Sequence, residues 1–212
     1  LGKVGEYREG MSVLDLERGI VNDIRPQPWQ TDTCIGQWFY RTGIRYKTAE
    51  SVVHMLADIV SKNGNLLLNF PLQPDGALDR ESEEVLTGLT AWMAVNAEAI
   101  HGTRPWQVFG EGPRHDTGGQ LNENRLKFAA EDIRFTTKGN VLYAICLGWP
   151  GNSLLLRSLA EGAPARFGRV ERVTMLGVPD QLQWTRSAAG LTVELPAVKP
   201  CDSAVVVKIC AA

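Results

Sequence analysis

Two stretches of helical periodicity flank one short apolar run in the first half of the chain. From residue 48 to 62, apolar side chains recur every three or four positions, with Thr48 placed to cap the helix and Gly64 just beyond its end. Three successive leucines at 66–68 are typical of a parallel strand that is covered on both faces. After a loop rich in Pro and Gly, Asp79 is placed to cap a second helix. This order of elements is typical of an α/β barrel, where the loops that follow the strands form the active site.

The pattern changes after residue 102. Long helical periods give way to short apolar runs separated by turn residues, at 133–136, 141–147, 154–156, 170–176, 191–195 and 204–209. The clearest turns lie at 138–140 and 187–190, and residues 110–119 are predicted to form a flexible polar loop. We therefore expect an α/β part and an all-β part. Residues 1–103 would form the C-terminal portion of a (β/α)8-like barrel, and residues 104–212 a C-terminal antiparallel β-sandwich.

Composition narrows the class of protein. The chain has 212 residues, 44% of them hydrophobic, and a formal net charge of −2. The absence of a basic cluster argues against a nucleic-acid partner, and no apolar run approaches the roughly 18 residues of a membrane span. The four cysteines and three histidines show no metal-ligand spacing, so we expect no metal and mainly buried free thiols, with a disulfide as an open alternative. No nucleotide-binding or serine-hydrolase motif occurs, and no cofactor is expected.

Four segments resemble the C-terminal half of α-L-fucosidases of glycoside hydrolase family 29. They read WQTDTCIGQWFY at 29–40, GNLLLN at 64–69, NAEAIHGTRPW at 96–106 and TMLG at 174–177. Together, and in this order, they span nearly the whole chain. The resemblance implies a catalytic barrel followed by a β-sandwich, and hydrolysis of terminal α-L-fucosyl linkages in oligosaccharides or glycoconjugates with retention of configuration. It also suggests a secreted, periplasmic or lysosome-like compartment.

Retaining hydrolysis requires two carboxyl groups, one as nucleophile and one as acid and then base. In the family the nucleophile is an aspartate in a Trp-x-Asp-Gly-like context upstream of Leu1, and this chain has no such motif. The chain also begins without an initiator Met or a signal peptide, so we expect the natural protein to extend upstream, with its N-terminal part as the partner of this chain. The resemblance places the acid/base at Glu17, with Asp15 as the second candidate. A surface ion pair of Glu17 with a neighbouring arginine is the competing structural interpretation.

Five further residues are candidates for substrate binding. Trp38 resembles the family's pocket aromatic, with Phe39 as its close rival, although burial in a core explains an aromatic equally well. Gln30 stands where many family members have Glu, and an amide cannot exchange a proton near neutral pH. It could still bind substrate or orient the acid. Asp32 and Asn69 lie near the predicted mouth of the barrel, where capping and turn formation are alternative roles.

His54 shares a helix stripe with Glu50, Asp58 and Lys62, a pattern typical of a solvated charged face, so we assign it no catalytic role. The alternative function for the whole chain is a catalytically inactive fragment, namely a structural or weakly sugar-binding β-sandwich module. The sandwich strands show no cluster of aromatics that would form a dedicated sugar-binding face.

Overall fold

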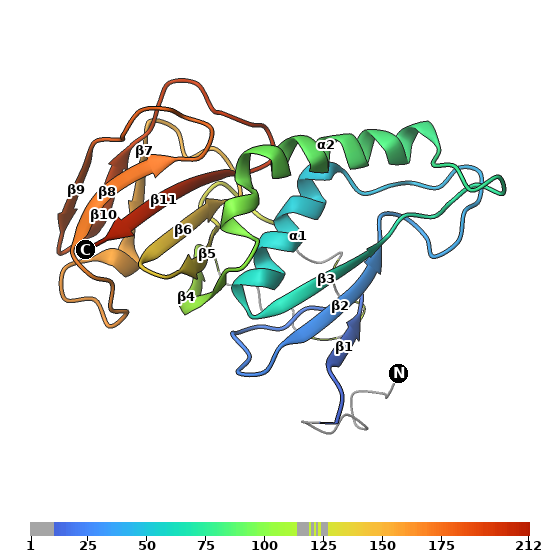
Figure 1. The fold of residues 1–212 in the computed structure, drawn as a ribbon, viewed down its shortest axis with the longest axis horizontal. Coiled ribbons are helices and arrows are strands. Elements are labelled where there is room, and N and C mark those ends of the chain that lie inside the picture. The colour runs from blue at the N-terminus through green and yellow to red at the C-terminus, as the bar shows by residue number, and fades with distance from the viewer. Residues whose placement is uncertain (1–10, 114–118, 120, 122, 124–126) are drawn as a thin grey trace.

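The computed structural model describes residues 11–113, 119, 121, 123 and 127–212. These residues form four layers, in the order parallel sheet, helix pair, five-stranded antiparallel sheet and three-stranded antiparallel sheet (Figure 1). The α/β part of the fold lies in the first half of the sequence and the all-β part in the second half, which confirms the predicted fold class.

The parallel sheet has the strand order β1 (Leu14–Glu17), β2 (Trp29–Cys34) and β3 (Gly64–Asn69). One face packs against the helices, because Leu66 and Leu68 pack into the same apolar clusters as the residues of the first helix. Leu67 points the other way and is 56% exposed. The expectation that both faces of this strand are covered is therefore wrong for the described residues, in which a single face of the sheet is packed.

Both predicted helix caps are confirmed. Helix α1 (Ala49–Ser61) begins at Thr48, whose side chain accepts a hydrogen bond from the N–H of Ser51, and α2 (Arg80–Asn96) begins at Asp79 in the same way. A short 3-10 helix, η1 (Ala97–Ala99), follows α2.

Gly64 has a different role from the predicted helix stop. It belongs to β3, and the left-handed residue after α1 is Asn63, with φ of 70°. A Cβ on Gly64 would lie 2.6 Å from the indole of Trp29, so glycine is needed there for close packing.

Three of the four residues of the polar stripe of α1 are buried, contrary to the expectation of a solvated face, and only Glu50 of the stripe is exposed. His54, Asp58 and Lys62 all lie in the interior. The physical reason is that α1 is covered on two sides, by the parallel sheet and by the antiparallel sheet next to it. His54 contacts the carbonyl of Ser203 at 3.0 Å, and Asp58 pairs with Arg134. A single sequence cannot show that a second layer will cover a charged stripe.

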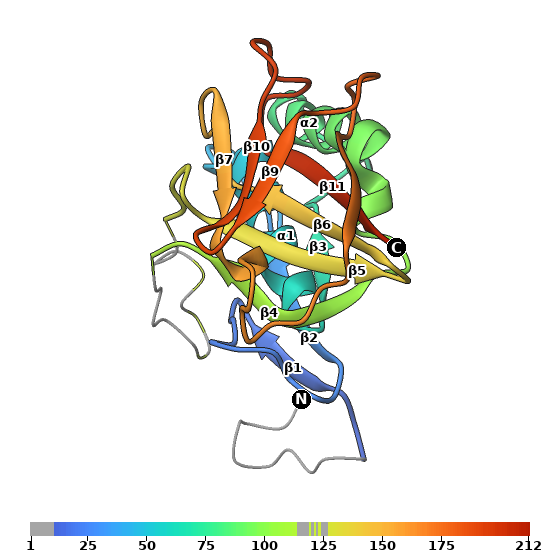
Figure 2. The same ribbon diagram turned by 90° about the vertical axis from the view of Figure 1, so that its left-hand side faces the viewer.

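The second half of the chain forms two packed antiparallel sheets, which Figure 2 shows one in front of the other. The larger sheet has the order β4 (Arg104–Glu111), β5 (Ile133–Lys138), β6 (Val141–Cys146), β11 (Val205–Ala211) and β8 (Val170–Met175). The smaller has the order β7 (Ser153–Leu156), β10 (Gly190–Glu194) and β9 (Trp184–Ser187), with the 3-10 helix η3 (Arg157–Leu159) after β7.

All six predicted apolar runs are strands, and two strands of the second half, β4 and β9, were not predicted. Strand β9 is short, and only one of its four residues, Trp184, is a strong apolar strand former. Strand β4 extends into the predicted loop at 110–119, so Gly110 and Glu111 are sheet residues. Residues 114–118 of that predicted loop lie outside the described residues. No helix in the described ranges is both long and apolar enough to cross a membrane.

Candidate active site

Alternate residues of the parallel sheet form a polar surface on the side away from the helices, which we call the inner face. Successive side chains of a strand point to opposite faces, and Leu14 and Leu16 of β1 are buried against α1. The residues between and after them therefore project from the inner face. The same alternation places five of the predicted site residues there: Asp15, Glu17, Gln30, Asp32 and Asn69.

Glu17 is the last residue of β1, at the carboxyl end of the sheet. Its Oε1 accepts a hydrogen bond of 3.1 Å from the indole N–H of Trp38, so two predicted site residues lie in direct contact. The aligned residue on β2 is Asp32. The next residue, Arg18, has a left-handed backbone with φ of 47°. Such conformations are uncommon outside glycine and cluster at functional sites.

The guanidinium of Arg18 lies next to the same tryptophan. Its Cζ is 5.3 Å from the ring centroid of Trp38, and its Nη2 donates to Sγ of Cys34 at 2.8 Å. Among the described residues, no ion pair joins Arg18 or Arg25 to Glu17. The competing interpretation of Glu17 as one half of a surface ion pair therefore has no support in the structure.

Asp32 is in an unusual environment for a carboxylate. Burial, with the nearby Asp15 and Glu17 carboxylates, raises its pKa above the ordinary value. Its Oδ1 is buried, and no donor within the described part of the chain reaches it. Buried polar oxygens are normally hydrogen-bonded, so this atom is suited to accept from a sugar hydroxyl or from a residue outside the described ranges.

Asp15 lies deeper on the inner face than Glu17. It aligns with Gln30, whose Nε2 donates to Oδ1 of Asp15 at 3.3 Å. Two residues of parallel strand correspond to roughly 6.6 Å along the sheet, so Asp15 is set back from the carboxyl end by about that distance. This position, together with the bond to Gln30, favours Glu17 over Asp15 as the residue at the mouth.

The remaining candidates differ in how they are fixed. Asn69 ends β3 and donates from Nδ2 to the carbonyl of Trp38 at 3.3 Å, which ties the segment that holds the tryptophan to the sheet. Phe39 is 85% exposed and is therefore not a core aromatic in the described structure. Trp38 is half-buried between Glu17 and Arg18, a contact that fits a role at the site better than a role in a core.

The sequence analysis missed a segment from the second half of the chain that meets this site. The backbone N–H of Leu121 donates to the carbonyl of Glu17, and that of Glu123 to the carbonyl of Arg18, both at 3.1 Å. The side chain of Glu123 is buried and bonds to Thr33. No periodicity or spacing connects residues this far apart in sequence.

The described residues include no group of three or more His, Cys, Asp and Glu side chains placed to hold a metal ion. All four cysteines lie within the described ranges and are free thiols, with Cys34 and Cys146 buried. Burial raises the pKa of the Cys146 thiol to about 12, so this thiol stays protonated and unreactive near neutral pH.

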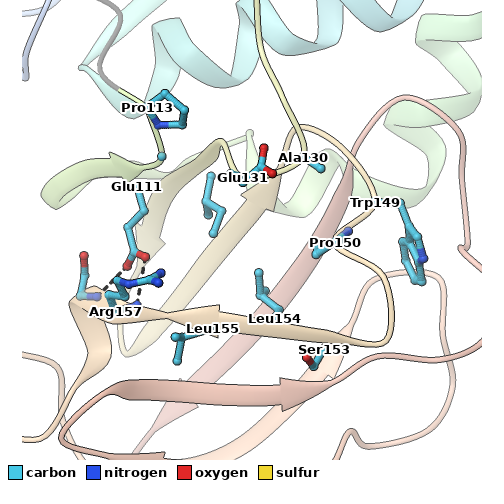
Figure 3. A pocket seen from close by; sticks show the side chains of 13 residues that line it. Glu111, Pro113, Ala130, Glu131, Trp149, Pro150, Ser153, Leu154, Leu155 and Arg157 are labelled. Carbon is cyan, nitrogen blue, oxygen red and sulfur yellow. Dashed lines mark hydrogen bonds between the residues drawn. The ribbon is translucent and has the colours of Figure 1, made fainter.

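A cavity of about 700 Å³ lies at an edge of the sandwich, apart from the inner face (Figure 3). Trp149, Pro150 and Leu154 contribute much of its apolar wall. The Glu111 carboxylate accepts from the backbone N–H groups at the start of η3, at 2.9 and 2.6 Å, and is thereby occupied. The cavity is lined by two carboxylates, Glu111 and Glu131, and none of the predicted site residues lies in it.

Comparison with known proteins finds α-L-fucosidases along most of the chain. The family model described as Alpha-L-fucosidase matches residues 3–98, and the one described as Alpha-L-fucosidase C-terminal domain matches residues 127–210. An α-L-fucosidase of Branchiostoma floridae is 31% identical over 169 residues, which are 77% of this chain and 33% of that protein. Human tissue α-L-fucosidase is 31% identical over 179 residues, 81% of this chain and 34% of that protein.

Solved structures agree in fold. α-L-Fucosidase isoenzyme 1 of Paenibacillus thiaminolyticus has a TM-score of 0.72 and 26% identity, covering 92% of this chain and 44% of that one. The α-fucosidase of Thermotoga maritima in complex with fucose has a TM-score of 0.70 and 25% identity, covering 92% of this chain and 42% of that one.

The described residues therefore combine a parallel sheet that carries carboxylates toward its carboxyl end with two helices and a β-sandwich. The chain belongs to the α-L-fucosidase family, glycoside hydrolase family 29, and corresponds to its C-terminal part. It spans about a third of the length of the curated relatives that it matches.

Proposed function

We propose that this chain supplies the acid/base half of the active site of a retaining exo-glycosidase that removes terminal α-L-fucosyl groups from fucosylated glycans. Glu17 is the acid/base, and an aspartate outside this chain is the nucleophile. The observation that carries the proposal is the position of Glu17, at the carboxyl end of a parallel strand, on the inner face, with its carboxylate bonded to Trp38.

The two chemical steps assign opposite proton transfers to Glu17. In the first, the aspartate attacks the anomeric carbon, the glycosidic C–O bond breaks, and protonated Glu17 gives its proton to the leaving oxygen. In the second, ionised Glu17 takes a proton from water as the water oxygen attacks the anomeric carbon and the aspartate leaves. The indole N–H of Trp38 fixes one carboxyl oxygen, and so directs the other toward the substrate.

The sheet itself supports the need for a partner. In the described residues β1 and β3 are edge strands, each paired on one side only, and the inner face exposes Leu67. Unpaired edges and exposed apolar side chains favour association with further strands. We propose that residues 1–103 complete a barrel with the N-terminal part of the same enzyme, and that residues 104–212 form the adjoining sandwich.

The substrate-binding roles follow from the same surface. We propose that Asp32 and Asn69 bind sugar hydroxyls, that Gln30 orients the carboxylates, and that Trp38 and Phe39 offer apolar area to the methyl edge of fucose. The Oδ1 of Asp32, which no donor among the described residues reaches, is the atom best suited to accept from a hydroxyl. The names of the relatives support fucose as the sugar.

The test uses the complete protein with Glu17→Gln and, as a matched control, Asp15→Asn. We expect Glu17→Gln to lower kcat/KM for a fucosyl disaccharide by about 10²- to 10⁴-fold, with a much smaller loss for a 2,4-dinitrophenyl fucoside, whose leaving group needs no proton. Azide should restore part of the turnover of the activated substrate and yield α-fucosyl azide. Near-normal disaccharide hydrolysis by Glu17→Gln, or this same profile in Asp15→Asn, would remove Glu17 from the mechanism.

A further inference from the structure

A buried carboxylate from the second half of the chain lies beneath the candidate site. The side chain of Glu123 is only 1% exposed. Its Oε2 accepts a hydrogen bond of 2.6 Å from the hydroxyl of Thr33, and its Oε1 pairs with Nζ of Lys47 at 2.9 Å. Thr33 belongs to β2, the strand next to Glu17, but its side chain is on the face toward the helices.

The backbone next to this carboxylate holds the turn that follows β1. The N–H groups of Leu121 and Glu123 donate to the carbonyls of Glu17 and Arg18. A third and a fourth hydrogen bond join Gly119 and Ile20 in both directions, at 3.1 and 2.8 Å. Three successive contacts from one short segment therefore bind the turn that begins at the acid/base.

The side-chain anchor is what gives these backbone bonds a fixed geometry. A backbone hydrogen bond contributes little net stability, because its groups bond to water instead when it breaks. A buried carboxylate with a charged partner is different, because moving it would separate the buried charge of Glu123 from the ammonium group of Lys47. Lys47 in turn donates to the carbonyl of Cys34, at the end of β2. The segment is thus fixed to the same strand that aligns with β1.

Correct placement of an acid/base matters because proton transfer requires hydrogen-bond distance to the leaving oxygen. A displacement of about 1 Å by a residue away from the chemistry can cost about a hundredfold in rate. Trp38 fixes the carboxyl group of Glu17, whereas the backbone N–H groups of Leu121 and Glu123 bind the carbonyls of Glu17 and Arg18. Both restraints are needed to define where the proton is delivered.

We propose that Glu123 is a positioning residue for the acid/base. Its buried carboxylate, bonded to Thr33 and Lys47, fixes the segment that holds the carbonyls of Glu17 and Arg18, and thereby the direction of the Glu17 carboxyl group. The inference rests on the proposed function of Glu17. It gives the part of the chain that follows the first sandwich strand, β4, a role in catalysis as well as in support.

The test is Glu123→Gln in the complete enzyme, which keeps the size of the side chain and removes its charge. We expect kcat/KM for a fucosyl disaccharide to fall at least about tenfold, and that for a 2,4-dinitrophenyl fucoside by less than about threefold. The alkaline limb of the disaccharide pH profile, which reports the acid, should move as well. If Glu123 only stabilised the fold, its substitution would lower kcat/KM equally for both substrates and leave the alkaline limb unchanged.

Glu98→Gln is the matched control. Glu98 also links the helical layer to the sandwich, through the hydroxyl of Tyr143 at 2.8 Å and an ion pair with Lys208, but it makes no contact with the turn at Glu17. The ratio of the two kcat/KM values should be unchanged in this variant. Thr33→Val, which removes one hydrogen bond to Glu123, should shift the ratio in the same direction by a smaller factor, and it decides the matter if Glu123→Gln does not fold.

The inference would be overturned if Glu123→Gln and Thr33→Val lowered kcat/KM equally for both substrates, or lowered it for neither. Glu17→Gln in parallel shows which claim has failed. If Glu17→Gln itself lacks the leaving-group dependence, the proposed function is wrong. If Glu17→Gln shows it and the Glu123 and Thr33 variants do not, the acid/base assignment stands and the positioning role of Glu123 is wrong.

Discussion

Asp58 on α1 joins the helix layer to the sandwich through Arg134 on β5, and it also pairs with a second buried cation, Lys62, at the end of α1. Its Oδ2 is 2.8 Å from Nζ of Lys62, and its Oδ1 is 2.7 Å from Nε of Arg134 on β5. The three side chains are 1%, 5% and 4% exposed. Each carboxylate oxygen of Asp58 pairs with one cation. The two buried cations contact this carboxylate and a few carbonyls in place of water. The substitution Asp58→Asn keeps the shape of this side chain and removes its charge.

The expected loss of stability depends on the contacts that the two cations keep after Asp58→Asn. Removing one partner of a buried ion pair typically costs about 3–5 kcal/mol, because the opposite charge is left desolvated without compensation. Here two cations lose a carboxylate partner. Among the described contacts, Arg134 keeps the more distant carboxylate of Asp132, at 3.8 Å, and Lys62 keeps the carbonyl of Val21, at 3.0 Å. The control is Glu84→Gln on α2, whose pair with Arg80 has the same four-residue spacing but is 62% and 90% exposed. It should cost less than about 0.5 kcal/mol.

The assay is urea unfolding of the complete protein, monitored by tryptophan fluorescence. The urea midpoints of the variants are compared provided that the slope of the unfolding free energy against urea concentration is unchanged. Asp58→Asn should lower the midpoint strongly and Glu84→Gln hardly at all. Adding Lys62→Met to Asp58→Asn should recover part of the loss, because it removes one of the two stranded cations. If Asp58→Asn unfolds at the same midpoint as Glu84→Gln, the reasoning from burial is refuted.

Three further predictions test packing, the site and pH dependence. Gly64→Ala should destabilise by about 1–3 kcal/mol, because its Cβ would lie 2.6 Å from the Trp29 indole, and an unchanged thermal midpoint would contradict this. Trp38→Phe should lower disaccharide kcat/KM by about tenfold through loss of the N–H bond to Glu17, whereas equal losses on activated fucosides would point to misfolding. Burial lowers the pKa of His54 below 6.5, so the unfolded chain binds that proton more readily, and stability should fall as pH drops below 6.5. His54→Gln should reduce this acid-side loss in unfolding measured from about pH 8 to pH 5, and an identical pH dependence would exclude the histidine.

The sequence predicted those parts of the fold that depend on local pattern. The caps at Thr48 and Asp79 were identified because a side-chain oxygen at that position satisfies a free helix N–H, whatever the helix packs against. The burial of Asp58 and Lys62 was not predicted, because it depends on strand β5, which comes much later in the chain. The hydrophobic pattern of a helix indicates one buried face, whereas α1 is buried on two sides.

The same distinction applies to the site. Glu17 and Trp38 were selected through resemblance, and the structure brings them to 3.1 Å, which no spacing rule predicts for residues on a strand and in a loop. Glu123 was missed because its role depends on three-dimensional contacts with Thr33 and Lys47 and on backbone bonds that any residue type could make. The amino-acid type at a position does not indicate whether its backbone makes such bonds.

The central claim is that Glu17 is one of two carboxyl groups of a retaining active site. The most direct measurement is a structure of the complete protein with fucose bound, giving the distance from the Glu17 carboxyl group to the nearest carboxyl group contributed from outside residues 11–212, across the anomeric carbon. The account predicts an aspartate about 5–5.5 Å away. A separation of about 6.5 Å or more, or no such aspartate facing Glu17, would contradict it.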